Sequence, residues 1–155
     1  MPNLSKEFEE VLDNEDASEQ DAQDFLEKNT KMFFPAFELN HHVHLSAVIS
    51  KFQLDTSLIC DFAYLTKSSG EWWFVLVELE HPDKELFTDA DIASAKLNAA
   101  IAQVNTWKTF IQRNSQEIIR KLSPIRKPLV SNQVYFKYIL VIGRTEVDPK
   151  NWTTS

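Results

Sequence analysis

The chain has 155 residues, of which 43% are hydrophobic and 12% aromatic, enough for one domain with its own core; this excludes a wholly disordered chain. No run approaches the roughly 20 apolar residues of a membrane span, and the first residues do not resemble a signal peptide. A single cysteine, Cys60, excludes an internal disulfide, so we expect a soluble, cytoplasmic protein with no membrane partner.

The net charge of −7 is distributed unevenly along the chain. Residues 1–30 contain ten acids and two bases, whereas residues 101–144 contain eight bases and one acid. A polyanion such as nucleic acid could bind the basic stretch while the acidic front end stays away from it. The alternative is a solvated helix face that happens to be basic.

Two helices are expected first in chain order. Residues 1–20 are acidic, with few apolar positions, and predict a weakly anchored helix or tail. A second helix is expected to start at Ser18, with Asp21 completing a capping box. Phe25 and Leu26 are expected to face the core.

Four strands are predicted, over residues 42–54, 58–66, 71–80 and 134–143. The third strand is apolar on both faces, which is typical of a central strand covered from two sides. Ser68, Ser69 and Gly70 predict a hairpin turn between the second and third strands.

One long helix is expected between the third and fourth strands, starting at Asp89 or Asp91 and continuing to about Leu122. The residues expected on its core face are Ile101, Val104 and Ile111. Helices, three strands, a helix and a strand in this order predict an α/β fold with at least one crossover connection.

Three carboxylates are expected to meet at one end of the sheet. A tight turn pairs Ser68 with Glu71, and the same register places Asp61 opposite Glu78 on a shared face. Glu80, two residues further on, shares that face. Clustered carboxylates repel one another unless protons or a cation neutralise them, and they suit Mg²⁺ or Mn²⁺. The alternative is a solvated strand end whose acids pair with lysines.

The sequence resembles the nuclease domain of Shedu-type antiphage proteins, in the PD-(D/E)XK superfamily. The runs that carry the resemblance are residues 61–65 (DFAYL), 73–87 (WFVLVELEHPDKELF) and 94–107 (SAKLNAAIAQVNTW), with 25–33 and 141–144 beside them. The resemblance covers roughly residues 24–145 and implies a restriction-endonuclease-like core, a mixed central sheet flanked by helices. We therefore expect a nuclease domain over residues 21–155, behind the acidic segment 1–20. A further helix and strand are expected in the family, so the chain would be a shortened version.

The resemblance also implies roles for individual residues. Asp61 and Glu78 match the two acids of the motif and would hold Mg²⁺ or Mn²⁺ together with the carbonyl of Leu79. Gln103, with Trp107 one helical turn later, resembles the Gln-x-x-x-aromatic element beside such sites; Trp107 lies either in the core or in the wall of a substrate cleft. The implied reaction is hydrolysis of DNA phosphodiester bonds by water that the metal activates.

One position departs from the motif, because Glu80 stands where the family pattern has a lysine. Glu80 would act as a general base or an extra metal ligand. Lys96 or Lys84 would supply the missing positive charge. The residues expected to contact DNA phosphates are Arg113, Arg120, Lys121 and Lys127.

The alternative function is a catalytically degenerate module of the same fold that binds nucleic acid or a partner protein; Glu80 and the acidic front end favour it. The oligomeric state is left open, although nucleases of this fold commonly act as homo-oligomers. His42 and His44 have a spacing that suits a transition metal, but an outward-facing edge strand is preferred because no third ligand is near. Cys60 is expected in the core.

Overall fold

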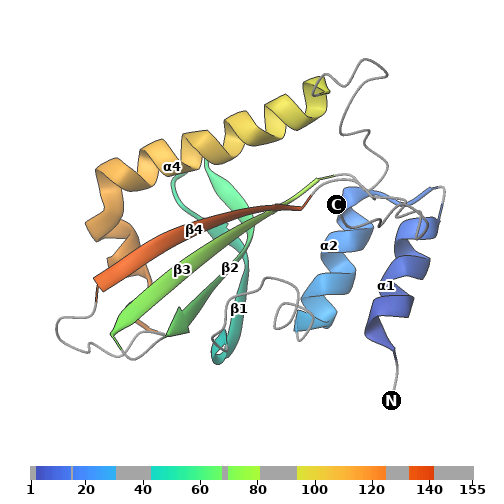
Figure 1. Ribbon diagram of the computed structural model, residues 1–155, viewed down its shortest axis with the longest axis horizontal. Coiled ribbons are helices and arrows are strands. Elements are labelled where there is room, and N and C mark those ends of the chain that lie inside the picture. Colours follow the sequence, from blue (N-terminus) through green and yellow to red (C-terminus); the bar gives the residue numbers. More distant parts are fainter. Residues whose placement is uncertain are drawn as a thin grey trace, which may run out of the picture.

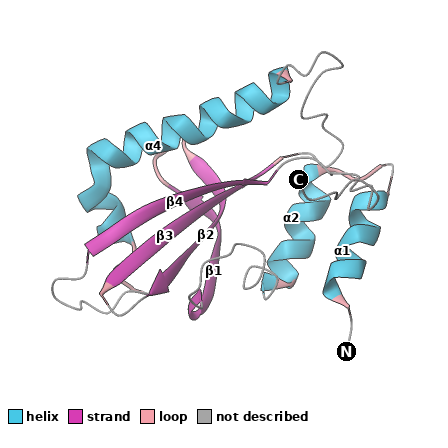
Figure 2. Ribbon diagram, viewed as in Figure 1, coloured by secondary structure: helices cyan, strands magenta, loops and turns pink. Residues whose placement is uncertain are grey.

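A computed structural model describes residues 3–14, 16–30, 43–67, 70–80, 94–124 and 133–141, with the backbone alone at 43–46. The helices and strands in these ranges (Figure 1, Figure 2) are α1 (Leu4–Asp13), α2 (Glu19–Lys28), β1 (Val43–Gln53), β2 (Ile59–Lys67), β3 (Glu71–Leu79), α4 (Ala95–Lys121) and β4 (Gln133–Val141). The order agrees with the prediction, and the strand bounds lie close to it. None of the described helices has the length and apolar character needed to cross a membrane.

The strands form one mixed sheet in the order β1-β2-β3-β4. β2 is antiparallel to both β1 and β3, whereas β3 and β4 are parallel, with α4 between them in the chain. A parallel pair requires such a crossover connection. The predicted α/β class, the crossover and the central place of β3 are confirmed. The restriction-endonuclease-like core stays a prediction.

Two apolar clusters hold the sheet between its helices. The α4-side cluster consists of Phe52, Leu54, Cys60, Ala63, Leu65, Trp72, Phe74, Leu76, Trp107, Ile111, Ile118 and Leu122. The α2-side cluster consists of Leu26, Phe62, Tyr64, Val75, Val77 and Leu79. Because β3 contributes alternate residues to both clusters, its sequence is continuously apolar, as a strand covered on two faces requires. Cys60 and Trp107 are core residues.

Helix α2 begins where the sequence predicts. The Ser18 side chain accepts a hydrogen bond from the Asp21 N–H while the Asp21 carboxylate accepts one from the Ser18 N–H, which confirms the capping box. Leu26 is buried in the α2-side cluster, but Phe25 packs on α1 instead, with its ring 5.3 Å from that of Phe8. Helix α1 has no buried residue, in keeping with its predicted weak anchoring.

Helix α4 differs from the prediction at its start. Ser94 caps it by accepting a hydrogen bond from the Leu97 N–H at 3.1 Å, so the described helix begins at Ala95. Asp89 and Asp91, the predicted starts, lie outside the described residues. Serine and aspartate are both favoured at the N-cap, so the sequence alone does not distinguish Ser94 from the two aspartates before it.

The core face of α4 also differs from the prediction. Its buried residues are Ala100, Trp107, Ile111 and Ile118. Ile101 is 43% exposed, so its predicted place in the core is wrong; Val104 is partly buried against the α4-side cluster. The apolar stripe runs through small and aromatic residues and leaves Ile101 beside it. A kink at Asn114 interrupts the helix, and the Asn114 side chain donates a hydrogen bond to the Phe110 carbonyl at 2.9 Å.

Candidate functional site

The hairpin of β2 and β3 brings the two predicted acids together. Its described register ends with Phe62 opposite Val77, which is the register predicted from the turn, although Ser68 itself lies outside the described residues. Asp61 and Glu78 follow directly beyond this last pair. Burial, together with the nearby charge of Asp61, raises the pKa of Glu78, as expected for two carboxylates in one place.

Asp61 is 5% exposed and is held by three parts of the chain. Its Oδ2 accepts a hydrogen bond from the Leu79 N–H at 2.8 Å, and its Oδ1 accepts one from the Lys51 ammonium at 2.5 Å. Its backbone carbonyl accepts a third from the Gln23 side-chain amide at 3.5 Å. The first of these contacts fixes the carboxylate beside the backbone of Leu79, the residue whose carbonyl is the predicted third metal ligand.

Glu78 is 7% exposed and has one satisfied and one unsatisfied oxygen. The Gln103 side-chain amide donates to Glu78 Oε1 at 2.5 Å, so the predicted proximity of Gln103 is confirmed. Glu78 Oε2 is buried without a hydrogen-bond partner among the described residues. Burial and the charge of Asp61 raise its pKa to about 8, with smaller contributions from Glu19 and Glu80. A buried oxygen without a donor is costly unless a proton or a cation binds it.

Lys51 of β1 completes the surroundings of Asp61, and the sequence analysis did not predict it. The exposed fractions of the two paired side chains are 48% for Lys51 and 7% for Asp61. Lys51 has φ of 50°, in the left-handed region, and no other non-glycine residue in the described ranges has a positive φ. This backbone conformation costs a non-glycine residue about 1–2 kcal/mol.

The alternation of side chains along β1 reverses at Lys51. Ser50 and Phe52 are two residues apart and would share one face of a regular strand. Instead Ser50 Oγ donates a hydrogen bond to Glu27 of α2, whereas Phe52 lies in the α4-side cluster. The register of β1 with β2 places Lys51 opposite Asp61, between the Ser50–Phe62 and Phe52–Cys60 pairs.

Gln23 of α2 is a second site residue that the sequence analysis missed. It is 1% exposed, and its Nε2 donates to Glu27 Oε1 at 3.0 Å as well as to the Asp61 carbonyl. Its Oε1 has no hydrogen-bond partner in the described part of the chain. Glutamine within a helix is usually exposed, so nothing in the local sequence indicated this burial.

The predicted cations and the third acid are placed differently. Lys84 lies outside the described residues, and Lys96 is exposed on α4 without a hydrogen bond or ion pair to either acid of the described site. Glu80 is half-buried. Within the described ranges no group of three or more His, Cys, Asp or Glu side chains is arranged to hold a metal ion, so the expected cluster of three carboxylates is not formed there. His42 lies outside the described residues, as does the side chain of His44.

The predicted phosphate-binding residues have separate environments. Arg113 and Arg120 are exposed on α4, and Arg113 borders a groove of about 590 Å³. The Lys121 ammonium instead donates to two backbone carbonyls at the end of β1, those of Gln53 and Leu54, at 3.2 and 2.9 Å. Lys127 lies outside the described residues. Lys121 therefore connects α4 to the sheet, and the two arginines remain the described candidates for phosphate contact.

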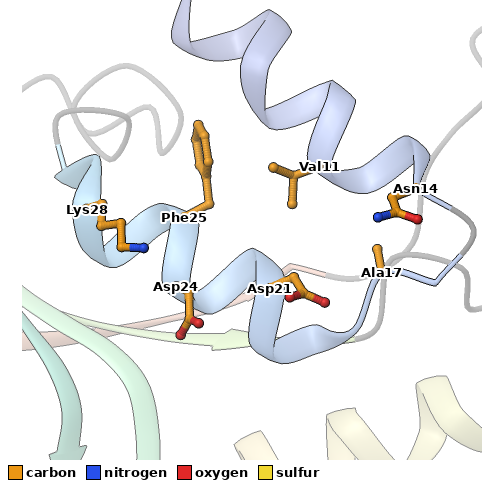
Figure 3. Close-up of a pocket in the computed structure, with 7 residues that line it drawn as sticks. All are labelled: Val11, Asn14, Ala17, Asp21, Asp24, Phe25 and Lys28. Atoms are coloured by element: carbon orange, nitrogen blue, oxygen red, sulfur yellow. The ribbon is translucent and has the colours of Figure 1, made fainter.

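A pocket of about 350 Å³ lies between α1 and α2 (Figure 3). Its lining residues are Val11, Asn14, Ala17, Asp21, Asp24, Phe25 and Lys28. Asp21 belongs to the capping box, and Asp24 accepts a hydrogen bond from Gln20 at 2.6 Å. Both acids therefore have local structural partners, and neither Asp61 nor Glu78 reaches this pocket.

The residues around Asp61 and Glu78 fit a hard divalent cation. Mg²⁺ and Mn²⁺ prefer oxygen ligands, and the two carboxylates together with the backbone of Leu79 offer several. One oxygen of Glu78 has no donor among the described residues. Each oxygen of Asp61 accepts one hydrogen bond in the described structure, and a carboxylate oxygen has a second lone pair to offer.

A protein-family model described as "Shedu protein SduA, C-terminal" matches residues 16–151. The match begins beyond α1 and includes Lys51, Asp61, Glu78 and Gln103. No curated protein matches the chain.

Proposed function

Since the chain belongs to the Shedu family, whose name indicates a role in antiphage defence, we propose that it is a metal-dependent nuclease that hydrolyses phosphodiester bonds of foreign DNA. The observation that carries the proposal is the pair of buried carboxylates, Asp61 and Glu78, on adjacent strands, of which Glu78 has one unpartnered oxygen among the described residues. The mixed sheet and its helices are in keeping with a PD-(D/E)XK core.

Separate residues of the chain would bind the metal ion, orient its ligands and accept a proton. Asp61, Glu78 and the Leu79 carbonyl would hold Mg²⁺ or Mn²⁺, and the Leu79 N–H and Gln103 amide orient the two carboxylates. The cation, when bound, supplies an activated water and offsets negative charge on the phosphoryl oxygens. Glu80 would accept a proton from the attacking water.

DNA would be held mainly through its backbone. Arg113 and Arg120 are exposed on α4, the helix that also carries Gln103, so one element links phosphate binding to the two acids. Such contacts position the duplex and carry no sequence information. Affinity should therefore fall steeply as salt is added, and a flat salt response would remove this part of the proposal.

A second candidate function is a binding module that has lost catalysis. Two observations favour it: Glu80 stands at the lysine position of the motif, and Lys51 is paired with one of the two proposed metal ligands. In this case the site would keep its fold and bind DNA or a partner protein without cutting.

Cleavage of supercoiled plasmid and of linear duplex in Mg²⁺ or Mn²⁺ separates the two functions. We would compare the wild type with a double variant, Asp61→Asn plus Glu78→Gln, which keeps the shape of both side chains. Glu117→Gln, an exposed carboxylate on α4, is the matched control. The double variant should cut more than about 100-fold more slowly, since even outer-shell partners of a metal cost 10–100-fold. Equal cutting by wild type and double variant would contradict the proposed site, and no cutting with salt-dependent DNA binding would favour the binding module.

A further inference from the structure

Lys51 forms an ion pair with Asp61, which is a proposed metal ligand. Among the described residues, Lys51 supplies the one ammonium in contact with the site. A divalent cation bound at Asp61 would compete with the Lys51 ammonium for the negative charge of this carboxylate. The motif position that normally supplies a lysine is Glu80, and the exposed Lys96 makes no contact with the acids in the described part of the chain. Lys51 is therefore the described residue best placed to bring positive charge to the reacting phosphate.

The backbone around Lys51 is shaped to direct this side chain. A glycine would adopt φ of 50° without strain, yet the chain has a lysine there. Strained residues of this kind persist where the surrounding structure enforces them, and they cluster at functional sites. Here the strained residue is also the point at which β1 reverses its alternation, and the register of β1 with β2 places Lys51 opposite Asp61.

The two partners differ in how firmly they are held. The Asp61 side chain is 7% exposed, and its other oxygen accepts a hydrogen bond from the Leu79 N–H, which does not depend on the lysine. Lys51 is 48% exposed and has a long, flexible side chain, so its ammonium can leave the carboxylate and be hydrated at once. Water screens the exposed lysine, and the cation that replaces it would compensate the buried charge of Asp61, so exchange leaves no buried charge unpaired.

We propose that Lys51 is an exchangeable counter-ion: it neutralises Asp61 until a divalent cation binds there, and it then contacts an oxygen of the DNA phosphate. This inference rests on the proposed function, because it needs a cation site at Asp61 and a phosphate ligand. The ammonium moves without any change in the sheet, since only the Lys51 side chain has to turn.

The test measures Mn²⁺ binding and DNA binding separately, on the full chain. Mn²⁺ alone is titrated by calorimetry into the wild type, Lys51→Met, Lys51→Arg and, as a matched control, Lys6→Met, which changes an exposed lysine of α1. Without its competitor, Asp61 in Lys51→Met should bind Mn²⁺ about three- to tenfold more tightly, whereas Lys6→Met should match the wild type. Lys51→Arg should bind Mn²⁺ no more tightly than the wild type, because a guanidinium holds a carboxylate at least as well as an ammonium does. If removal of the charge in Lys51→Met destabilises the protein, Lys51→Arg still keeps the ion pair and the fold.

Fluorescence anisotropy of a short labelled duplex in Ca²⁺ then measures phosphate contact. Lys51→Met should bind the duplex several-fold more weakly than Lys6→Met does. An unchanged or weaker Mn²⁺ affinity in Lys51→Met, beside normal binding by the wild type, would overturn the exchange and leave the metal site standing. Unchanged duplex affinity would overturn the phosphate contact. If none of the proteins binds Mn²⁺, the metal site of the proposed function fails, and the exchange fails with it.

Discussion

The raised pKa of Glu78 predicts a specific effect of pH on stability. In the folded protein, burial and the charge of Asp61 raise this pKa from the usual 4.5 to about 8. Between these values the folded state holds a proton that the unfolded state has released. Stability therefore falls as pH rises through this interval, and this loss should be absent in Glu78→Gln, which cannot ionise. The variant also keeps an oxygen that can accept from Gln103.

The size of the pKa shift of Glu78 determines how much the free energy of unfolding changes with pH. At about 1.4 kcal/mol for each pH unit, the full difference amounts to roughly 5 kcal/mol. Glu78 is 7% exposed, so solvent screening removes little of this, and the pKa of about 8 already includes the opposing effect of the Lys51 ammonium. We expect Glu78→Gln to resemble the wild type near pH 5 and to exceed it by about 2–5 kcal/mol near pH 8.5.

Urea unfolding in the presence of EDTA measures this difference, with tryptophan fluorescence as the signal, because Trp72 and Trp107 are buried in the α4-side cluster. Glu117→Gln makes the same chemical change at an exposed position of α4 and should follow the wild type at every pH. If the gap between Glu78→Gln and the wild type stayed constant from pH 5 to pH 8.5, the burial and repulsion assigned to Glu78 would be refuted.

Three further substitutions test the fold and the site. Ile118→Ala should lower the free energy of unfolding by about 2–5 kcal/mol, and Ile101→Ala by less than about 1 kcal/mol, because Ile118 is buried and Ile101 is 43% exposed; equal losses in urea titrations would contradict the orientation of α4. Gln103→Ala removes the donor to Glu78 and should weaken Mn²⁺ binding about tenfold by calorimetry, and unchanged affinity would show that this contact does not orient the ligand. Ser18→Ala should cost about 1 kcal/mol in thermal unfolding through loss of the capping box, whereas Ser18→Thr should recover most of it.

Most of the fold could be predicted because its signals are local. The capping box needs only Ser18 and Asp21, and the register of the hairpin follows from the length of its turn. That register is sufficient to place Asp61 beside Glu78. The orientation of α4 about its own axis was harder to predict. Ala100 and Trp107 lie on the core face and Ile101 lies beside it, although isoleucine is more hydrophobic than alanine.

The parts of the site that were missed depend on tertiary structure. Lys51 reaches Asp61 through the register of β1 with β2, and its left-handed backbone conformation is not marked by any local pattern. Gln23 is buried because α2 packs over the end of β2, and its sequence surroundings are those of an exposed helix position. Lys96 lies seven residues before Gln103 on α4, and this helical spacing cannot show that a lysine of β1 contacts Asp61.

The location of the lysine on β1 has a physical consequence for how the site would respond to a cation. A lysine at position 80 would lie two residues from Glu78 on the same strand and would favour its ionised form. With Glu80 there, repulsion adds to burial, and Glu78 retains a proton at neutral pH. The proton on Glu78 and the ammonium on Asp61 then balance the two acids separately. A divalent cation would displace both at once, since ligands must lose their protons to bind it. Binding of the cation would therefore make Lys51 available to a phosphate, because the cation and the ammonium repel each other at Asp61.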